Sequence, residues 1–163
     1  MKNGLKHTLK KMDVLKLDNI LVREATLDDL DEVALAFQEY AKTFTVKGSN
    51  FTFLASHIIK LRESGIFLAF YRQRLIGFVT YMSNFSFTYT CSAVVFEDFW
   101  VNKEYRHDKI PEMIFRRCMD LALQSGVNHI YTHIAANDYV RQRYLRRYGF
   151  ETTHYQLFRS QEK

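Results

Sequence analysis

The chain has 163 residues, of which 47% are apolar and 15% aromatic, enough for one domain with a buried core. One proline and six glycines leave no stretch typical of a flexible linker, and no apolar run is long enough to span a bilayer. Cys91 and Cys118 are too few for a disulfide framework, and we expect two buried cytosolic thiols. The net charge of +5 suits an anionic ligand, either a nucleotide cofactor or a nucleic acid, and by itself selects neither.

The first third of the chain predicts a basic extension, one strand and two helices. Residues 1–18 contain five lysines and predict an N-terminal extension, whereas residues 19–163 predict a single domain. A strand is expected over residues 20–25, followed by a helix start at which Thr26 and Asp29 cap one another. Apolar residues at helical spacing then predict helices over 30–44 and 51–61.

The rest of the chain alternates between strand and helix patterns. Strands are predicted over residues 66–71, 75–82, 92–101, 129–135 and 152–158, and helices over 110–126 and 137–148. Residues 92–101 are apolar nearly throughout, which is typical of a central strand covered on both faces. The order predicts an α/β fold, in which a mixed sheet has helices on both sides.

Four short segments carry a family resemblance: residues 75–79 (LIGFV), residues 97–101 (EDFWV), Tyr105–Arg106, and Asn137 with Tyr144 and Gly149–Phe150. With the element order, they resemble the GCN5-related N-acetyltransferase (GNAT) superfamily over about residues 20–158. Within that superfamily the closest resemblance is to the diamine (spermidine/spermine) N-acetyltransferase branch. The resemblance therefore implies a GNAT-like mixed sheet and transfer of acetyl from acetyl-CoA to a primary amine, a diamine or polyamine in the closest branch.

The resemblance also implies where the cosubstrate binds. Acetyl-CoA would lie between the fourth and fifth strands, with its pantetheine paired to the backbone near Phe99 and Val101. The pyrophosphate would sit on amides after Arg106, and Asn137 would join the cofactor site. The amine would lose a proton to a base and attack the thioester, and a tyrosine would protonate the leaving thiolate.

Glu97 is the candidate general base, because a carboxylate in an apolar strand is costly to bury unless it is paired or functional. A structural salt bridge explains the residue equally well. Asp98 is expected on the opposite face, since successive strand residues alternate. There it would bind the substrate ammonium or cap a neighbouring backbone group.

Tyr144 is the candidate general acid. Its spacing from Asn137 fits the family, whereas counting back from Gly149 places Leu145 on the catalytic position. Aromatic packing of Tyr144 with Tyr148 on one helix face is the structural alternative.

The loop after Arg106 departs from the family pattern. Family members place glycine or another small residue where this chain has His107, Lys109 and Pro111. Glycine permits positive φ, and proline removes an amide donor, so the pyrophosphate loop is degenerate. Arg106, His107 and Lys109 could supply replacement contacts to phosphate, and Asp108 suits the cap of the following helix.

Two competing functions follow from these departures. The first is a degenerate GNAT-fold protein that does not bind CoA and acts as a binding or regulatory protein. The second is an acetyltransferase acting on tRNA or protein, suggested by four arginines of the last helix: Arg141, Arg143, Arg146 and Arg147. No recognised nucleic-acid-binding motif accompanies them, so nucleic acid ranks low as a partner.

The remaining expectations concern the acceptor and the assembly. A polyamine needs an acidic pocket, which Glu97, Asp98 and Glu104 would have to supply in a basic chain. A cytoplasmic homodimer is predicted, with the aromatic residues between 83 and 91 at its interface, and no membrane or metal partner.

Overall fold

The computed structural model describes residues 19–44, 49–86, 91–107, 109–134 and 137–151. The expected N-terminal extension, the strand over 152–158 and Asp108 lie outside these residues. The chain divides into two compact units, residues 1–131 and residues 132–163, and each is described by itself. No helix among the described residues is both long and apolar enough to cross a membrane.

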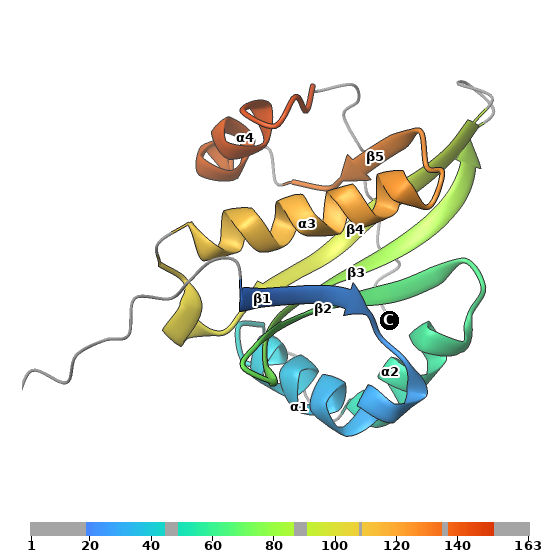
Figure 1. Ribbon diagram of the computed structural model, residues 1–163, viewed down its shortest axis with the longest axis vertical. Coiled ribbons are helices and arrows are strands. Elements are labelled where there is room, and N and C mark those ends of the chain that lie inside the picture. The colour runs from blue at the N-terminus through green and yellow to red at the C-terminus, as the bar shows by residue number, and fades with distance from the viewer. Residues whose placement is uncertain (1–18, 45–48, 87–90, 108, 135–136, 152–163) are drawn as a thin grey trace, which may run out of the picture. The chain divides into compact units, whose positions relative to one another are not determined.

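Five strands form one sheet in the order of the chain (Figure 1). They are β1 (Ile20–Glu24), β2 (Ser64–Tyr71), β3 (Arg74–Ser86), β4 (Cys91–Val101) and β5 (His129–Thr132). Strands β1 to β4 pair antiparallel, and β5 lies next to β4 after a helical connection, giving the mixed sheet that was predicted. The strand expected over 129–135 ends early, at Thr132.

Helices cover both faces of the sheet (Figure 1). One face carries α1 (Leu30–Ala41), which follows the 3-10 turn η2 (Leu27–Asp29), and α2 (Phe51–Lys60). The other face carries α3 (Ile110–Gln124), which follows the 3-10 turn η3 (Lys103–Tyr105). The second unit contains α4 (Tyr139–Arg146), which begins two residues later than predicted because the Asp138 side chain caps the Arg141 amide at 3.0 Å.

Helix α1 ends three residues before its predicted end. The amides of Thr43 and Phe44 bond to carbonyls three residues back, at Tyr40 and Ala41, with N···O distances of 3.0 Å each. These tighter bonds close the helix and hold Phe44 in a fixed turn.

The main core lies between the sheet and the pair α1 and α2. Its fully or nearly fully buried members are Ala25, Val33, Ala36, Phe37, Ala55, Ile66, Leu68, Phe70, Phe78 and Trp100. On the opposite face, the Phe96 ring of β4 packs edge-on against Phe115 of α3 at 5.6 Å. Strand β4 is therefore covered on both faces, as its apolar sequence predicted.

The glycine in the family-like segment over residues 75–79, Gly77, has a structural reason. A Cβ atom at Gly77 would lie 2.8 Å from the Trp100 carbonyl oxygen of the neighbouring strand. Because that oxygen belongs to the backbone, a side chain at this position would force the two strands apart.

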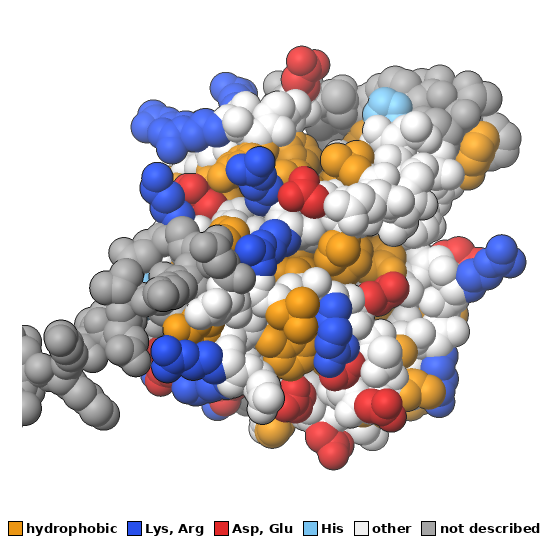
Figure 2. Space-filling model, viewed as in Figure 1, with side chains coloured by type: hydrophobic (Ala, Val, Ile, Leu, Met, Phe, Trp, Pro, Cys, Tyr) orange, Lys and Arg blue, Asp and Glu red, His pale blue; other side chains and the backbone are white. Residues whose placement is uncertain are grey.

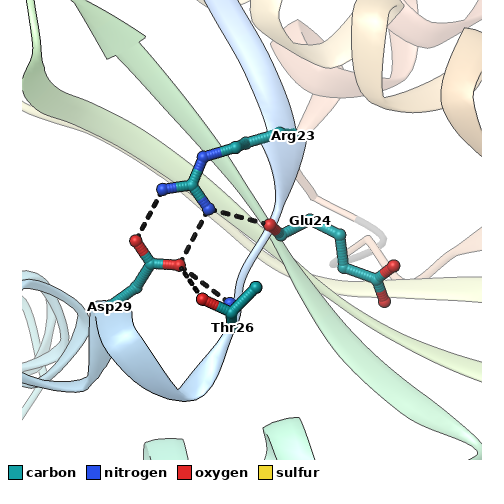
Figure 3. A network of polar contacts seen from close by, with 4 residues as sticks. All are labelled: Arg23, Glu24, Thr26 and Asp29. Carbon is teal, nitrogen blue, oxygen red and sulfur yellow. Dashed lines mark hydrogen bonds and ion pairs between the residues drawn. The ribbon is translucent and has the colours of Figure 1, made fainter.

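A polar network joins β1 to the start of the first helical segment (Figure 3). The Arg23 guanidinium donates to both carboxylate oxygens of Asp29, at 2.8 and 2.6 Å, and to the Glu24 carbonyl at 3.0 Å. The Thr26 amide donates to the same carboxylate at 2.8 Å, which confirms the predicted capping pair. Arg23 and these donors lower the pKa of Asp29 to about 2.

Cys118 is fully buried in α3, and burial raises the pKa of its thiol far above the ordinary value. The thiol is consequently unreactive at neutral pH, as a structural cysteine should be. The side chain of Cys91 lies outside the described residues.

Candidate functional site

A β-bulge interrupts β4 at its only two adjacent carboxylates. Val79 of β3 pairs with Phe99, but Tyr81 pairs with Phe96, so Thr80 alone faces both residues between them, Glu97 and Asp98. Bulges of this kind bend a strand and re-aim its side chains, and they recur beside active sites.

Glu97 and Asp98 were predicted to lie on opposite faces of the sheet, and the bulge shows that regular alternation does not apply to them. The rings of Phe96 and Phe99 both lie close to Phe115 of α3, at 5.6 and 5.5 Å. In a regular strand, residues three apart lie on opposite faces. The alternation that separated Glu97 from Asp98 therefore does not hold at this point of the strand.

Asp98 lies at the centre of a hydrogen-bond network that joins three elements. Its Oδ1 accepts from the Tyr40 hydroxyl of α1 at 3.0 Å, and its Oδ2 accepts from the Thr80 hydroxyl of β3 at 3.1 Å. The Asp98 amide also donates to the Thr80 oxygen, at 3.0 Å. These contacts fix the half-buried carboxylate in one orientation, on the face of the sheet that carries α1.

The Asp98 carboxylate retains acceptor capacity. Two carboxylate oxygens offer about four acceptor positions, and the two hydroxyls fill two of them. Within the described part of the chain, no Lys, Arg or His forms an ion pair with Asp98. A cationic group that reached this carboxylate would therefore find both charge and free lone pairs.

Glu97 differs from its expected state. Its side chain is exposed, so the cost of burying a carboxylate, on which its predicted role as base rested, does not arise. The bulge accounts for the difference, because it displaces this residue from the regular apolar course of β4.

An aromatic wall adjoins the Asp98 network. The Tyr40 ring packs edge-on against Phe78, at 5.6 Å, and against Phe44, at 5.0 Å. Phe78 is buried in the core, whereas 54% of Phe44 is exposed to solvent. Neither Tyr40 nor Phe44 was singled out from the sequence, and the only local signal was a hydroxyl-bearing residue on the apolar stripe of α1.

The loop before α3 keeps a backbone feature that glycine usually supplies. Lys109 has φ of 62° and ψ of 13°, in the left-handed region, and forms the N-terminal cap of α3. Pro111 follows in the first helical turn, where its missing amide is tolerated. Family members have glycine or another small residue at this position. Lysine stands there in this chain, and the position still has the positive φ that glycine usually adopts.

Arg106 anchors this loop to the end of β4. Its Nε donates to the Val101 carbonyl oxygen at 2.6 Å, although the residue as a whole is exposed. The predicted pairing of pantetheine near Val101 would therefore find this carbonyl already engaged. Three basic side chains, Lys103, Arg106 and Lys109, are exposed around the loop, while nearby Glu104 is paired with Arg74 at 3.2 Å.

The β5 side of β4 is only partly covered by its neighbouring strand. The Asn128 amide donates to the Ser92 carbonyl at 3.0 Å, which places the start of β5 beside the start of β4. Strand β5 has four residues and β4 has eleven. Pairing with β5 therefore ends before Phe99 and Val101, and the Phe99 backbone lies in the stretch of β4 beyond β5.

The second unit holds the remaining predicted site residues. The Tyr144 ring packs against Tyr148 at 5.1 Å, as in the structural alternative, and Leu145 is buried. Asn137 is exposed in the turn before α4. An open hollow of about 460 Å³ is lined by four residues of α4 and by Arg147, which follows the helix; the four are Tyr139, Gln142, Arg143 and Arg146.

Residues 11–158 match the family model described as acetyltransferase (GNAT) domain. No curated protein sequence gives a significant match to the chain.

Solved structures share the fold. A "probable acetyltransferase" is 21% identical with a TM-score of 0.76, covering 87% of this chain and 99% of its own. An aminoglycoside acetyltransferase from an uncultured soil metagenomic sample, in complex with trehalose, is 10% identical with a TM-score of 0.75, covering 89% and 98%. The ribosomal-protein-alanine N-acetyltransferase of Brucella melitensis biovar Abortus 2308 is 17% identical with a TM-score of 0.69, covering 88% and 99%. At these identities the likeness concerns the fold alone.

Proposed function

Because the chain belongs to the acetyltransferase (GNAT) domain family, we propose that it transfers the acetyl group of acetyl-CoA to a primary amine. The part of this proposal that concerns the amine acceptor is supported by the Asp98 carboxylate. It is half-buried, held by two neutral hydroxyls, and without a cationic partner among the described residues. Such a group suits the ammonium form of an amine.

In the proposed reaction, the ammonium donates hydrogen bonds to Asp98 and loses one proton before attack. Asp98 or Glu97 accepts this proton, directly or through water. The amine nitrogen then forms a bond to the acetyl carbonyl carbon, the bond from that carbon to sulfur breaks, and the nitrogen releases a second proton to solvent, from which the acid is later restored. The departing thiolate takes a proton from an acid, for which Tyr144 remains the proposed residue because Leu145 has no proton to give.

The cofactor half of the proposal rests on β4 and the following loop. The Phe99 backbone, beyond the reach of β5, would pair with the pantetheine in place of Val101, whose carbonyl is bonded to Arg106. Arg106, His107 and Lys109 would contact the phosphates, and Asn137 is retained as a further contact. The left-handed Lys109 supports this assignment over a loop that has lost its function.

A polyamine acceptor finds less support than a single amine. Of the three carboxylates that were expected to form an acidic pocket, Glu104 is engaged by Arg74. The other two, Glu97 and Asp98, are adjacent in β4, so they offer a polycation no acidic surface longer than two neighbouring residues.

The test is acetylation of a set of primary amines by the purified protein with acetyl-CoA, followed by mass spectrometry of the products. Asp98→Asn should lower kcat/KM roughly 100-fold or more, because it removes the charge that binds the ammonium and a candidate proton acceptor. Asp31→Asn, at an exposed carboxylate of α1, is the matched control and should change little.

Comparison with Glu97→Gln assigns the base. If Glu97 accepts the proton, its variant loses kcat, and Asp98→Asn raises mainly KM. A wild-type protein that acetylates no amine in the set would overturn the proposed function.

A further inference from the structure

We infer that the acceptor is a monoamine whose apolar body, aromatic or aliphatic, lies on Phe44 and Tyr40 while its ammonium binds Asp98. This inference rests on the proposed function and narrows its substrate class. It makes Phe44 a specificity-determining residue and Tyr40 a positioning residue for the carboxylate.

The geometry of Tyr40 connects the two parts of this subsite. One end of its side chain, the hydroxyl, bonds to the Asp98 carboxylate at 3.0 Å, while its ring packs at 5.0 Å against Phe44. A single tyrosine ring therefore separates the carboxylate from an exposed apolar surface. A molecule with an amine on a short chain beside an apolar group could contact both at once.

The exposure of Phe44 is informative because of what surrounds it. A lone exposed aromatic residue is ordinary on a protein surface. Phe44, however, has its backbone held in a closed turn by its amide bond to Ala41, at 3.0 Å, and its ring is supported on one side by the Tyr40 ring, at 5.0 Å. A preorganised aromatic surface loses little entropy on binding, and burying it stabilises an apolar ligand.

The charges around this subsite favour one ammonium over several. Glu39, which precedes Tyr40, is already paired with Lys42 at 2.5 Å. Asp29, near the start of α1, is paired with Arg23 at 2.6 Å. Among the described residues, Asp98 is thus the half-buried carboxylate beside Tyr40 that carries no ion pair, and it provides one built position for an ammonium, whereas Glu97, next to it in β4, is exposed.

The experiment compares kcat/KM for 2-phenylethylamine, butylamine, methylamine and spermidine at saturating acetyl-CoA. We expect kcat/KM to be higher for 2-phenylethylamine and butylamine than for methylamine, which lacks an apolar body, and for spermidine, which carries extra charges. Phe44→Ala should raise KM for 2-phenylethylamine roughly tenfold, the equivalent of about 1.4 kcal/mol, and leave methylamine unchanged.

Two variants separate the roles. Phe53→Ala removes a phenylalanine of α2 that is 68% exposed and whose ring stacks on His57 at 6.0 Å, and it should leave KM unchanged for every amine. Tyr40→Phe keeps the ring but removes the hydroxyl that donates to Asp98, so it should lower kcat/KM for methylamine and for 2-phenylethylamine by similar factors.

The outcomes separate the inference from the proposed function. Preference for spermidine, or a Phe44→Ala variant that affects methylamine and 2-phenylethylamine equally, would refute the inference and leave amine acetylation standing. If no amine is acetylated, the proposed function fails, and calorimetric titration of 2-phenylethylamine then decides the inference. Binding that Phe44→Ala weakens supports the apolar subsite, and absence of binding to the wild type refutes it.

Discussion

Lys109 takes a backbone conformation that costs a residue with a Cβ atom about 1–2 kcal/mol. The chain tolerates this cost at the start of α3, in a loop where three basic side chains are exposed. Glycine would fit this backbone better, and the lysine places an exposed ammonium in the loop that is proposed to contact the phosphates.

Lys109→Gly should raise the free energy of unfolding by up to about 1 kcal/mol, because relief of the left-handed strain outweighs the extra entropy of glycine in the unfolded chain. The free energy is obtained from urea denaturation. Lys103→Gly, in η3 where φ is not positive, is the matched control and should be destabilising. If Lys109→Gly lowered the free energy of unfolding, the claim that Lys109 is strained would be wrong.

Much of the fold, but only part of the site, could be predicted from the sequence. Strands and helices follow from apolar periodicity, which is a local property, so their order was correctly predicted as far as α4, and the strand expected over 152–158 lies outside the described residues. Glu97 was singled out because a carboxylate in an apolar strand is unusual, and Asp98 was named as its neighbour, expected on the opposite face. Tyr40, the partner of Asp98, however, lies 58 residues away, and contacts at such separation leave no local pattern. The bulge opposite Thr80 was equally invisible, which is why the burial of Glu97 was wrongly expected.

At the scale of elements, the network around Asp29 fixes how β1 leads into α1 (Figure 3). The position of α1 matters for the proposed subsite, because its last turn carries Tyr40 and the turn that follows it carries Phe44. The Asp29 side chain is 9% exposed and its partner Arg23 is 40% exposed, so solvent screens the pair in part.

Asp29→Asn should cost about 1–2 kcal/mol of stability at pH 7, a value reduced for the exposure of Arg23. The pKa of Asp29 is lowered from 3.8 to about 2 on folding, so its contribution is fully present above pH 3.8. It is lost as the pH falls through about 2, and the difference between wild type and variant should shrink over that range.

Urea unfolding at a series of pH values measures this difference. Asp28→Asn, at the exposed neighbouring carboxylate, should give a small difference at every pH. A penalty for Asp29→Asn that does not change between pH 7 and the acid range would show that the charge is not responsible.

At the scale of the molecule, charge is unevenly distributed despite the net value of +5. Residues 26–41 contain five of the 18 acidic residues and no Lys or Arg. Acidic side chains gather in the lower part of Figure 2, where Figure 1 places α1. The loop over residues 102–109, by contrast, contains Lys103, Arg106 and Lys109 against two acidic residues, Glu104 and Asp108, a net charge of +1. A cationic amine and an anionic cofactor would thus be attracted to different segments of the first unit.

The homodimer remains a prediction, with the ends of β3 and β4 as its interface. Met82 and Phe85 of β3 are 53% and 56% exposed, a surface that a second copy would cover. Light scattering should give a molar mass twice the 19.4 kDa of the chain, and Phe85→Asp should shift the measured mass toward that of the monomer. A wild-type monomer at working concentration would refute the dimer.

The central claim, that this family member uses acetyl-CoA despite its unusual loop, is tested most directly by calorimetric titration of acetyl-CoA into the purified protein. The account predicts micromolar binding, about −8 kcal/mol. Absence of binding at millimolar acetyl-CoA would contradict it, and would favour a GNAT-fold protein that has lost its cosubstrate.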